Sequence, residues 1–188
     1  KDSDATIGLI AKDSEQAEDL LEAIKFYLPN ENAQVLPSFE LLPYDNQPPA
    51  LGHISEVNHA LDKIIVGKGI FILCAQSLMS RYICPKLFLK SKKTIILNEK
   101  ITIKDIVDDL IEKGYVRSST VRDYGTYCEK GNILDIYPIG GCKPVRLHFN
   151  SKITKIVAFD PISQRNAGDL NNFSYYPVHS VPFSKEDR

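Results

Sequence analysis

The chain has 188 residues, 43% of them hydrophobic, and its 23 lysines and arginines nearly balance its 24 aspartates and glutamates. A chain of this length can form one large or two small domains, and we expect it to fold without disulfides or metals. Because the formal net charge is −1 and both signs are interspersed, no long-range field favours duplex nucleic acid or an anionic membrane.

The cysteines form no recognisable metal or disulfide pattern. There is no C-x-x-C pair and no histidine at zinc-finger spacing, so reduced thiols are expected. No apolar run approaches the length that spans a membrane, and the N-terminus lacks the basic-then-apolar pattern of a signal peptide. We therefore expect a cytoplasmic protein. The four cysteines are Cys74, Cys84, Cys128 and Cys142.

The first part of the chain alternates strand and helix patterns. Residues 5–11 predict a buried strand, and a helix capped by Asp13 or Ser14 follows it. A short strand at 34–36, a turn-rich segment, a second helix and a strand at 70–74 come next. This order is typical of a parallel α/β unit. The apolar helix faces are predicted at Ala17, Leu20, Leu21, Ile24, Tyr27 and Leu28, and at Ile54, Val57, Leu61, Ile64 and Ile65.

The composition changes at Pro85, where a cluster of lysines begins. We interpret this cluster as a solvated linker, although it could contact phosphate or an acidic partner. We place a domain boundary near residue 89, between an incomplete α/β domain at 1–88 and a β-rich domain at 89–176. Residues 177–188 are expected to begin a return into the first domain. The lysines are Lys86, Lys90, Lys92 and Lys93.

The second domain begins with a predicted strand at 94–97 and a helix. Thr102 caps this helix, Asp105 occupies the capping-box position and Gly114 follows its end. The carboxylate pair Asp108-Asp109 is expected on the solvent side. The core side is predicted at Ile103, Ile106, Val107, Leu110 and Ile111.

Short β-like runs, separated by turn signals, occupy residues 124–160. The run at 145–150 has the period of two that is typical of a half-buried antiparallel strand, and another run follows at 153–159. A polar strand face can bind a partner, but it is also the ordinary way in which an antiparallel sheet meets water. Residues 166–172 are predicted to be turn-like and residues 173–178 extended. In the run at 145–150, Arg146, His148 and Asn150 point one way, and Val145, Leu147 and Phe149 the other. In the run before it, Ile133, Asp135 and Tyr137 alternate with Asn132, Leu134 and Ile136, as in a strand.

Catalytic and nucleotide-binding patterns are missing from the sequence. No G-x-x-x-x-G-K-[ST] or G-x-G-x-x-G motif follows a strand and opens a helix. Gly67-Lys68-Gly69 precedes a strand, so its amides would not form a phosphate site at a helix N-terminus. Ser80 and Cys84 have no positioned base, and the four histidines are scattered. We therefore predict no catalytic, cofactor-binding or metal site, and we expect that this chain is not itself an enzyme.

Four segments resemble, in order and spacing, the N-terminal region of the bacterial transcription-repair coupling factors. That region is similar to the excision-repair protein UvrB, in which a helicase-like domain precedes a β-rich domain that docks on UvrA. The resemblance implies an α/β and α+β fold, with a truncated helicase-like parallel domain followed by a β-rich UvrA-interaction domain with a packed helix. The segments are ELLPYD at 40–45, SLMSRYICP at 77–85, GNILDIYP at 131–138 and FDPISQR at 159–165.

The resemblance also implies which residues contact UvrA. The family has an arginine before the G-x-x-L-D strand, an arginine in the later R-L-x-F strand and an aromatic residue nearby. These positions fall on Lys130, Arg146 and Asn150. Arg146 matches, Lys130 keeps the charge without the planar fork, and Asn150 departs from the aromatic residue. Truncation of an interface arginine typically costs about 2 kcal/mol, so we expect Arg146→Ala to weaken UvrA binding by on the order of 30-fold with the fold intact.

The function implied by the resemblance is UvrA recruitment in transcription-coupled nucleotide excision repair. Whole proteins of the family are implied to be ATP-dependent DNA translocases, with ATP and Mg as cofactors, that displace stalled RNA polymerase from double-stranded DNA. One alternative is a fragment of UvrB or of a related repair helicase, although UvrB would carry a long tyrosine-rich hairpin after Asp45. Another is a nucleic-acid-binding module that uses the lysines at 86–93.

Overall fold

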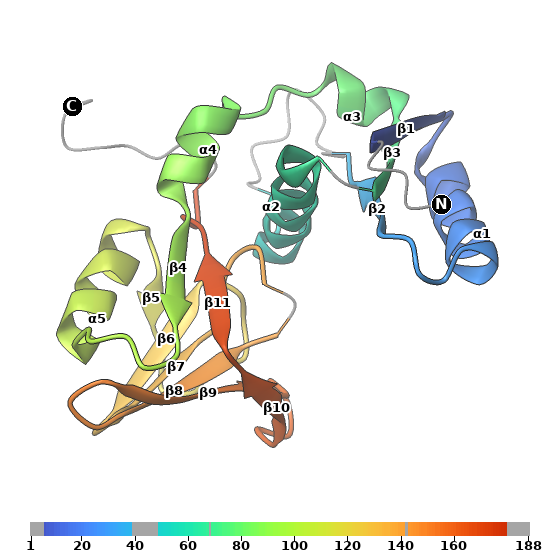
Figure 1. The fold of residues 1–188 in the computed structure, drawn as a ribbon. Coiled ribbons are helices and arrows are strands. Elements are labelled where there is room, and N and C mark those ends of the chain that lie inside the picture. Colours follow the sequence, from blue (N-terminus) through green and yellow to red (C-terminus); the bar gives the residue numbers. More distant parts are fainter. Residues whose placement is uncertain (1–5, 39–48, 68, 142, 180–188) are drawn as a thin grey trace. The chain divides into compact units, whose positions relative to one another are not determined.

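The chain is a mixed structure of helices and several sheets, divided into two compact units, Lys1–Pro85 and Lys86–Arg188. The computed structural model describes residues 6–38, 49–67, 69–141 and 143–179 (Figure 1). Several expectations fall outside these described residues, namely those for the segment at 40–45, Lys68, Cys142 and residues 180–188.

The first unit is built on a parallel three-stranded sheet. β3 (Gly69–Cys74) lies between β1 (Thr6–Ala11) and β2 (Ala33–Leu36) and pairs in parallel with both. Parallel strands need crossover connections, and α1 (Ser14–Tyr27) and α2 (Leu51–Val66) lie between the strands in the chain. The predicted order of these five elements is confirmed.

The two helices of the first unit pack on opposite faces of its sheet. Ala17 of α1 packs with Val35 and Ile72, whereas Val57 of α2 packs with Leu36. Val35 and Leu36 are consecutive in β2, and consecutive strand residues point to opposite faces. Both sheet faces are therefore covered by a helix, as is usual for parallel strands.

α1 begins as predicted, but its last turn does not join the core. Asp13 is the N-cap, and its carboxylate accepts a hydrogen bond of 2.9 Å from the N–H of Gln16. Tyr27 and Leu28 were predicted on the core face and are instead 77% and 48% exposed. The part of the helix that packs on the sheet ends at Ile24, so the last turn projects beyond the core.

The second unit is β-rich, with a large sheet, a small sheet and two helices. Its elements are α4 (Pro85–Ser91), β4 (Lys93–Ile96), α5 (Ile103–Glu112), β5 (Val116–Arg117), β6 (Thr126–Lys130), β7 (Ile133–Ile136), β8 (Val145–Phe149), β9 (Ile153–Phe159), β10 (Asn166–Leu170) and β11 (Asn172–Tyr175). The large sheet has the order β10-β9-β8-β7-β6-β5, and only β5 and β6 in it are parallel. β4 and β11 form the small antiparallel sheet.

The core of the second unit includes one face of the large sheet. Leu134 and Leu147 stand opposite each other on β7 and β8 and are both fully buried. Ile106 and Leu110 of α5 and Tyr175 of β11 are also fully buried. The helical spacing of Ile106 and Leu110 explains why a single side of α5 is covered.

The predicted capping box of α5 is confirmed, whereas the predicted division of this helix into a solvent side and a core side was partly wrong. The backbone N–H of Asp105 donates to the Thr102 hydroxyl, and the Asp105 carboxylate accepts from the Thr102 N–H. Asp109 is only partly exposed, because its carboxylate accepts a hydrogen bond of 2.5 Å from the Tyr175 hydroxyl. Burial, with the nearby Asp109, raises the pKa of Tyr175 above its ordinary value. Ile111, predicted on the core side, is 55% exposed.

Two segments of the second unit differ from their predicted structure. The lysine-rich segment after Pro85 forms α4 rather than a linker, and its Phe88 is buried against Tyr176, with 4.6 Å between the ring centroids. Residues 166–172, predicted to be turn-like, form β10 and the start of β11. Nearly all side chains of β10 are exposed, so backbone pairing with β9 makes the strand without a hydrophobic pattern to reveal it.

Candidate functional site

The candidate site lies on the face of the large sheet opposite Leu134 and Leu147. We call it the Arg146 face and define it by two rows of residues that the strand register sets side by side across β6, β7, β8 and β9. Alternate residues of a strand share a face, so the two rows lie on the same side of the sheet. The first row is Cys128, Asp135, Arg146 and Val157, and the second row is Lys130, Ile133, His148 and Lys155.

At the centre of this face, Arg146 and Asp135 form a bidentate ion pair. The Nε of Arg146 lies 2.7 Å from Oδ1 of Asp135, and Nη2 lies 2.8 Å from Oδ2. Asp135 is 5% exposed and the Arg146 side chain 22% exposed, so the carboxylate is buried while part of the Arg146 side chain reaches solvent. Paired, charge-assisted hydrogen bonds of this kind fix the orientation of an arginine.

An aromatic ring supports the guanidinium from a neighbouring strand. The central guanidinium carbon of Arg146 lies 4.7 Å from the centroid of the Phe159 ring, within the range of a cation–π contact. Phe159 is fully buried in a cluster with Val121, Cys128 and Tyr137. The hydrogen bonds to Asp135 raise the pKa of Arg146, against the opposing effect of partial burial, so its positive charge is secure.

Lys130, the second predicted contact residue, lies on the same face at the end of β6. It is exposed, and the following Gly131 turns the chain with a φ of 59°. An open hollow of about 450 Å³ adjoins it. The lining residues are Arg117, Ser118, Ser119, Cys128, Glu129 and Lys130.

Asn150, the third predicted residue, is not a member of either row. The register of β8 with β9 shifts between His148 and Phe149, and Asn150 lies in the turn beyond that irregularity. It is exposed, and its backbone N–H donates to the carbonyl of Lys152 at 2.9 Å. The structure thus brings Lys130 and Arg146 onto one face and leaves Asn150 at its margin.

Asp135 and Phe159 were not identified as site residues from the sequence. Strand alternation gave the direction of Asp135, and the GNILDIYP segment contains it. The pairing of β7 with β8, which sets Asp135 directly opposite Arg146, requires the register of the folded sheet. Phe159 comes from a third strand, β9, and its contact with Arg146 is equally non-local.

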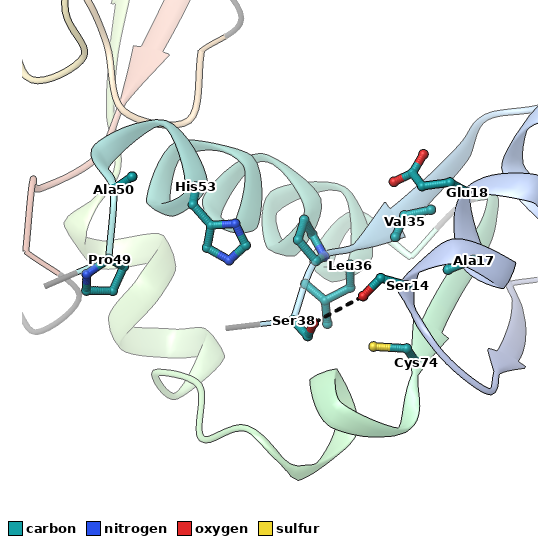
Figure 2. A pocket seen from close by; sticks show the side chains of 11 residues that line it. Ser14, Ala17, Glu18, Val35, Leu36, Ser38, Pro49, Ala50, His53 and Cys74 are labelled. Carbon is teal, nitrogen blue, oxygen red and sulfur yellow. Dashed lines mark hydrogen bonds between the residues drawn. The ribbon is translucent and has the colours of Figure 1, made fainter. Parts of the chain in front are cut away.

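A second hollow, of about 380 Å³, lies in the first unit at the carboxyl ends of β2 and β3 (Figure 2). Ligands of parallel α/β proteins often bind at such strand ends. Its polar lining includes Ser14, Ser38 and Cys74, and the two serine hydroxyls lie 3.4 Å apart. Burial alone would raise the pKa of the Cys74 thiol, but hydrogen bonds involving Ser77 and Ser38 lower it below its ordinary value.

The described part of the chain holds neither a metal-binding cluster nor a membrane-spanning helix. There, no group of three or more histidine, cysteine, aspartate or glutamate side chains is placed to hold a metal ion. Among the same residues, no helix is long and apolar enough to cross a membrane. Cys74, Cys84 and Cys128 are free thiols, and Cys142 lies outside the described residues.

The part of the chain that carries the Arg146 face is similar to a known protein domain. Residues 94–180 match the UvrB interaction domain, and this segment contains the whole Arg146 face. The chain is 31% identical to the transcription-repair-coupling factor of Haemophilus influenzae over 158 residues, which is 82% of this chain and 14% of that protein. It is 28% identical to the Escherichia coli and Myxococcus xanthus proteins of the same name, over 94% and 98% of this chain and 16% of each relative. The chain therefore spans about one sixth of the length of these relatives.

Proposed function

We propose that this chain recruits UvrA during transcription-coupled nucleotide excision repair. Its residues 94–180 match the UvrB interaction domain, and most of its length is similar to transcription-repair-coupling factors. The observation that carries this proposal is the Arg146 face. It presents a fixed guanidinium and the exposed Lys130 within the segment that matches the interaction domain. A cationic surface of this kind suits an acidic patch on the partner.

The first unit has a different role in this proposal. Its parallel strands, with a helix on each face, support the proposal of a helicase-like α/β domain. We assign no catalytic step to the chain. ATP, Mg, double-stranded DNA and RNA polymerase would be bound by other parts of the longer protein, which would act in the cytoplasm as an ATP-dependent DNA translocase. A UvrB fragment is not favoured, because the relatives are transcription-repair coupling factors.

The choice of test substitution follows from the ion pair. Arg146→Ala would leave the buried Asp135 carboxylate without its guanidinium, which costs on the order of 2 kcal/mol or more of stability. The effect of Arg146→Ala on UvrA binding would therefore be mixed with a loss of stability. Arg146→Gln removes the charge but retains an N–H that can donate to Asp135, so it separates binding from folding.

The decisive experiment is a titration of UvrA with the chain at modest ionic strength. We expect Arg146→Gln to weaken binding by on the order of 30-fold, as for other arginines at the centre of an interface. Arg81→Gln, the same charge change at an exposed position of the first unit, is the matched control and should bind like the unsubstituted chain. Denaturant unfolding would verify that both variants fold.

Two results would count against this proposal in different ways. If the unsubstituted chain failed to bind UvrA even at low salt, where charge contacts are strongest, UvrA recruitment by this chain would be refuted. If it bound but Arg146→Gln had the same affinity, recruitment would stand and Arg146 would be removed from the contact surface.

A further inference from the structure

We propose that Asp135 is a positioning residue for UvrA binding, which holds the Arg146 guanidinium so that its outer edge receives a carboxylate of the partner. This inference rests on the proposed function and deepens it. Asp135 itself is 5% exposed and too buried to contact a partner directly. Any effect of Asp135 on binding must therefore pass through the residue that it orients.

The hydrogen-bond geometry decides which part of Arg146 is offered to the partner. Asp135 occupies the edge of the guanidinium formed by Nε and Nη2. A guanidinium has five N–H groups, so these two bonds leave three, on Nη1 and Nη2. Two of these three, one on Nη1 and one on Nη2, lie along the same edge, and that edge can bind a second carboxylate through two parallel hydrogen bonds. The ligand that fits is an aspartate or glutamate side chain of the partner.

Phe159 and Asp135 together restrict the motion of Arg146 before any partner arrives. The carboxylate fixes the guanidinium in its plane, and the Phe159 ring lies against it at 4.7 Å. A flexible arginine would lose its rotamer freedom on binding, whereas this arginine has lost most of it on folding. Pre-organisation of this kind favours the complex without adding any contact to it.

The same ion pair could have the opposite effect on binding. Asp135 partly neutralises Arg146, and if the partner's carboxylate needed the Nε edge, Asp135 would compete with it. Removal of the Asp135 charge would then strengthen binding. The Asp135 carboxylate is buried and bonded to Nε and Nη2, which leaves the Nη1–Nη2 edge for a partner and favours positioning over competition. The two models predict affinity changes of opposite sign.

Asp135→Asn is the direct test, because the amide keeps the size of the carboxylate and removes its charge. We expect UvrA affinity to fall between about twofold and tenfold, the cost of ordering one rotamer-rich side chain on binding. Asp108→Asn is the matched control, because Asp108 is exposed on α5 and belongs to neither row of the Arg146 face. It makes the same charge change without touching Arg146, and affinity should stay within about twofold.

A double-mutant cycle separates positioning from a general effect on the fold. If Asp135 acts through the guanidinium, Asp135→Asn should cause no further loss of affinity when Arg146→Gln is already present. Additive losses, or tighter binding of Asp135→Asn alone, would overturn this inference while UvrA recruitment still stood. Absence of UvrA binding by the unsubstituted chain would overturn the proposed function and this inference with it.

A second measurement needs no partner. NMR relaxation of the Arg146 Nε–H should report a rigid side chain in the unsubstituted protein and a mobile one in Asp135→Asn, with the exposed Arg81 as a mobile reference in both. Unchanged rigidity of Arg146 in folded Asp135→Asn would also refute the positioning role. Since backbone signals would report the fold independently, unfolding could not be mistaken for a loss of side-chain order.

Discussion

Arg146 and Lys130 are cations on the same sheet face, but only Arg146 is part of a bidentate ion pair. Lys130 is exposed and ends β6, where its flexible side chain has no described bidentate partner to orient it. Lys130 therefore offers a partner only its positive charge, whereas Arg146 also offers hydrogen-bond donors that are held in one orientation. This difference between the two residues predicts different results when each is replaced.

We expect Lys130→Arg to bind UvrA as tightly as the unsubstituted chain or a few-fold more tightly. Arginine keeps the charge and adds a planar fork that can bind a carboxylate bidentately. Lys104→Arg, on the exposed side of α5, makes the same change away from the Arg146 face and should have no effect. Isothermal titration with UvrA would measure both. Weaker binding of Lys130→Arg would indicate that the partner approaches this position differently from the two-arginine arrangement of the family.

For single residues, the sequence predicted on which side of a strand a side chain lies, but not which residue of the next strand it contacts. Strand alternation correctly set Arg146 on the polar side of its strand, and the resemblance selected Lys130 for the same surface. Asp135 remained an unassigned strand residue, because no local pattern states which residue of the next strand stands opposite. The departure of Asn150 from the family aromatic residue was visible in the sequence, whereas its place beyond the β8 irregularity was not.

At the scale of elements, α5 was the most predictable part of the chain. Its cap, capping box and apolar spacing are all local signals, and the structure confirms the cap and the box. β10 was the least predictable, because its exposed side chains carry no period and its order comes from backbone bonds to β9. α4 was not predicted because lysines dominate the composition of its segment. In the structure, the single buried Phe88 anchors the helix.

The capping box of α5 gives a prediction with a pH dependence. Thr102→Ala removes the hydroxyl that accepts from the N–H of Asp105, and we expect the melting temperature of the second unit to fall by about 4–8 °C at neutral pH. The side-chain and backbone hydrogen bonds with Thr102 lower the pKa of Asp105. A lowered carboxyl pKa stabilises the fold above the pKa of the unfolded chain, and that contribution is lost as the pH falls through the folded value.

The difference between Thr102→Ala and the unsubstituted chain should accordingly shrink as the pH falls below about 4, near the ordinary pKa of aspartate. Calorimetry across this range would measure it. Asp108→Asn, on the exposed side of the same helix, is the control and should leave the effect of Thr102→Ala unchanged. A Thr102→Ala effect that stayed constant down to pH 2 would show that the Asp105 carboxylate contributes nothing through this box.

The segment that matches the family and the compact second unit begin and end at different residues. The match covers residues 94–180, whereas the second unit begins at Lys86 and includes nearly all of α4. Phe88 of this helix is 3% exposed and stacks on Tyr176 near the other end of the unit, and Lys92 lies 5.9 Å from the centroid of the same ring. These contacts indicate that α4 completes the core of the interaction unit.

We therefore expect a chain that begins at residue 86 to keep the stability of the second unit, and one that begins at residue 93 to lose a substantial part of it. Removal of a buried phenylalanine costs about 3–5 kcal/mol, and Phe88→Ala in the whole chain should destabilise the second unit by that amount. Leu87→Ala, at a neighbouring position that is 52% exposed, should have little effect. Urea unfolding would compare the two shortened chains with the Phe88→Ala and Leu87→Ala variants.

Wherever the second unit remains folded, UvrA affinity should be unchanged, because Arg146, Asp135 and Phe159 all belong to the large sheet. Equal stability of the chains that begin at 86 and 93 would mean that the stacking of Phe88 on Tyr176 adds nothing, and that the limits of the family match are also the limits of the folding unit.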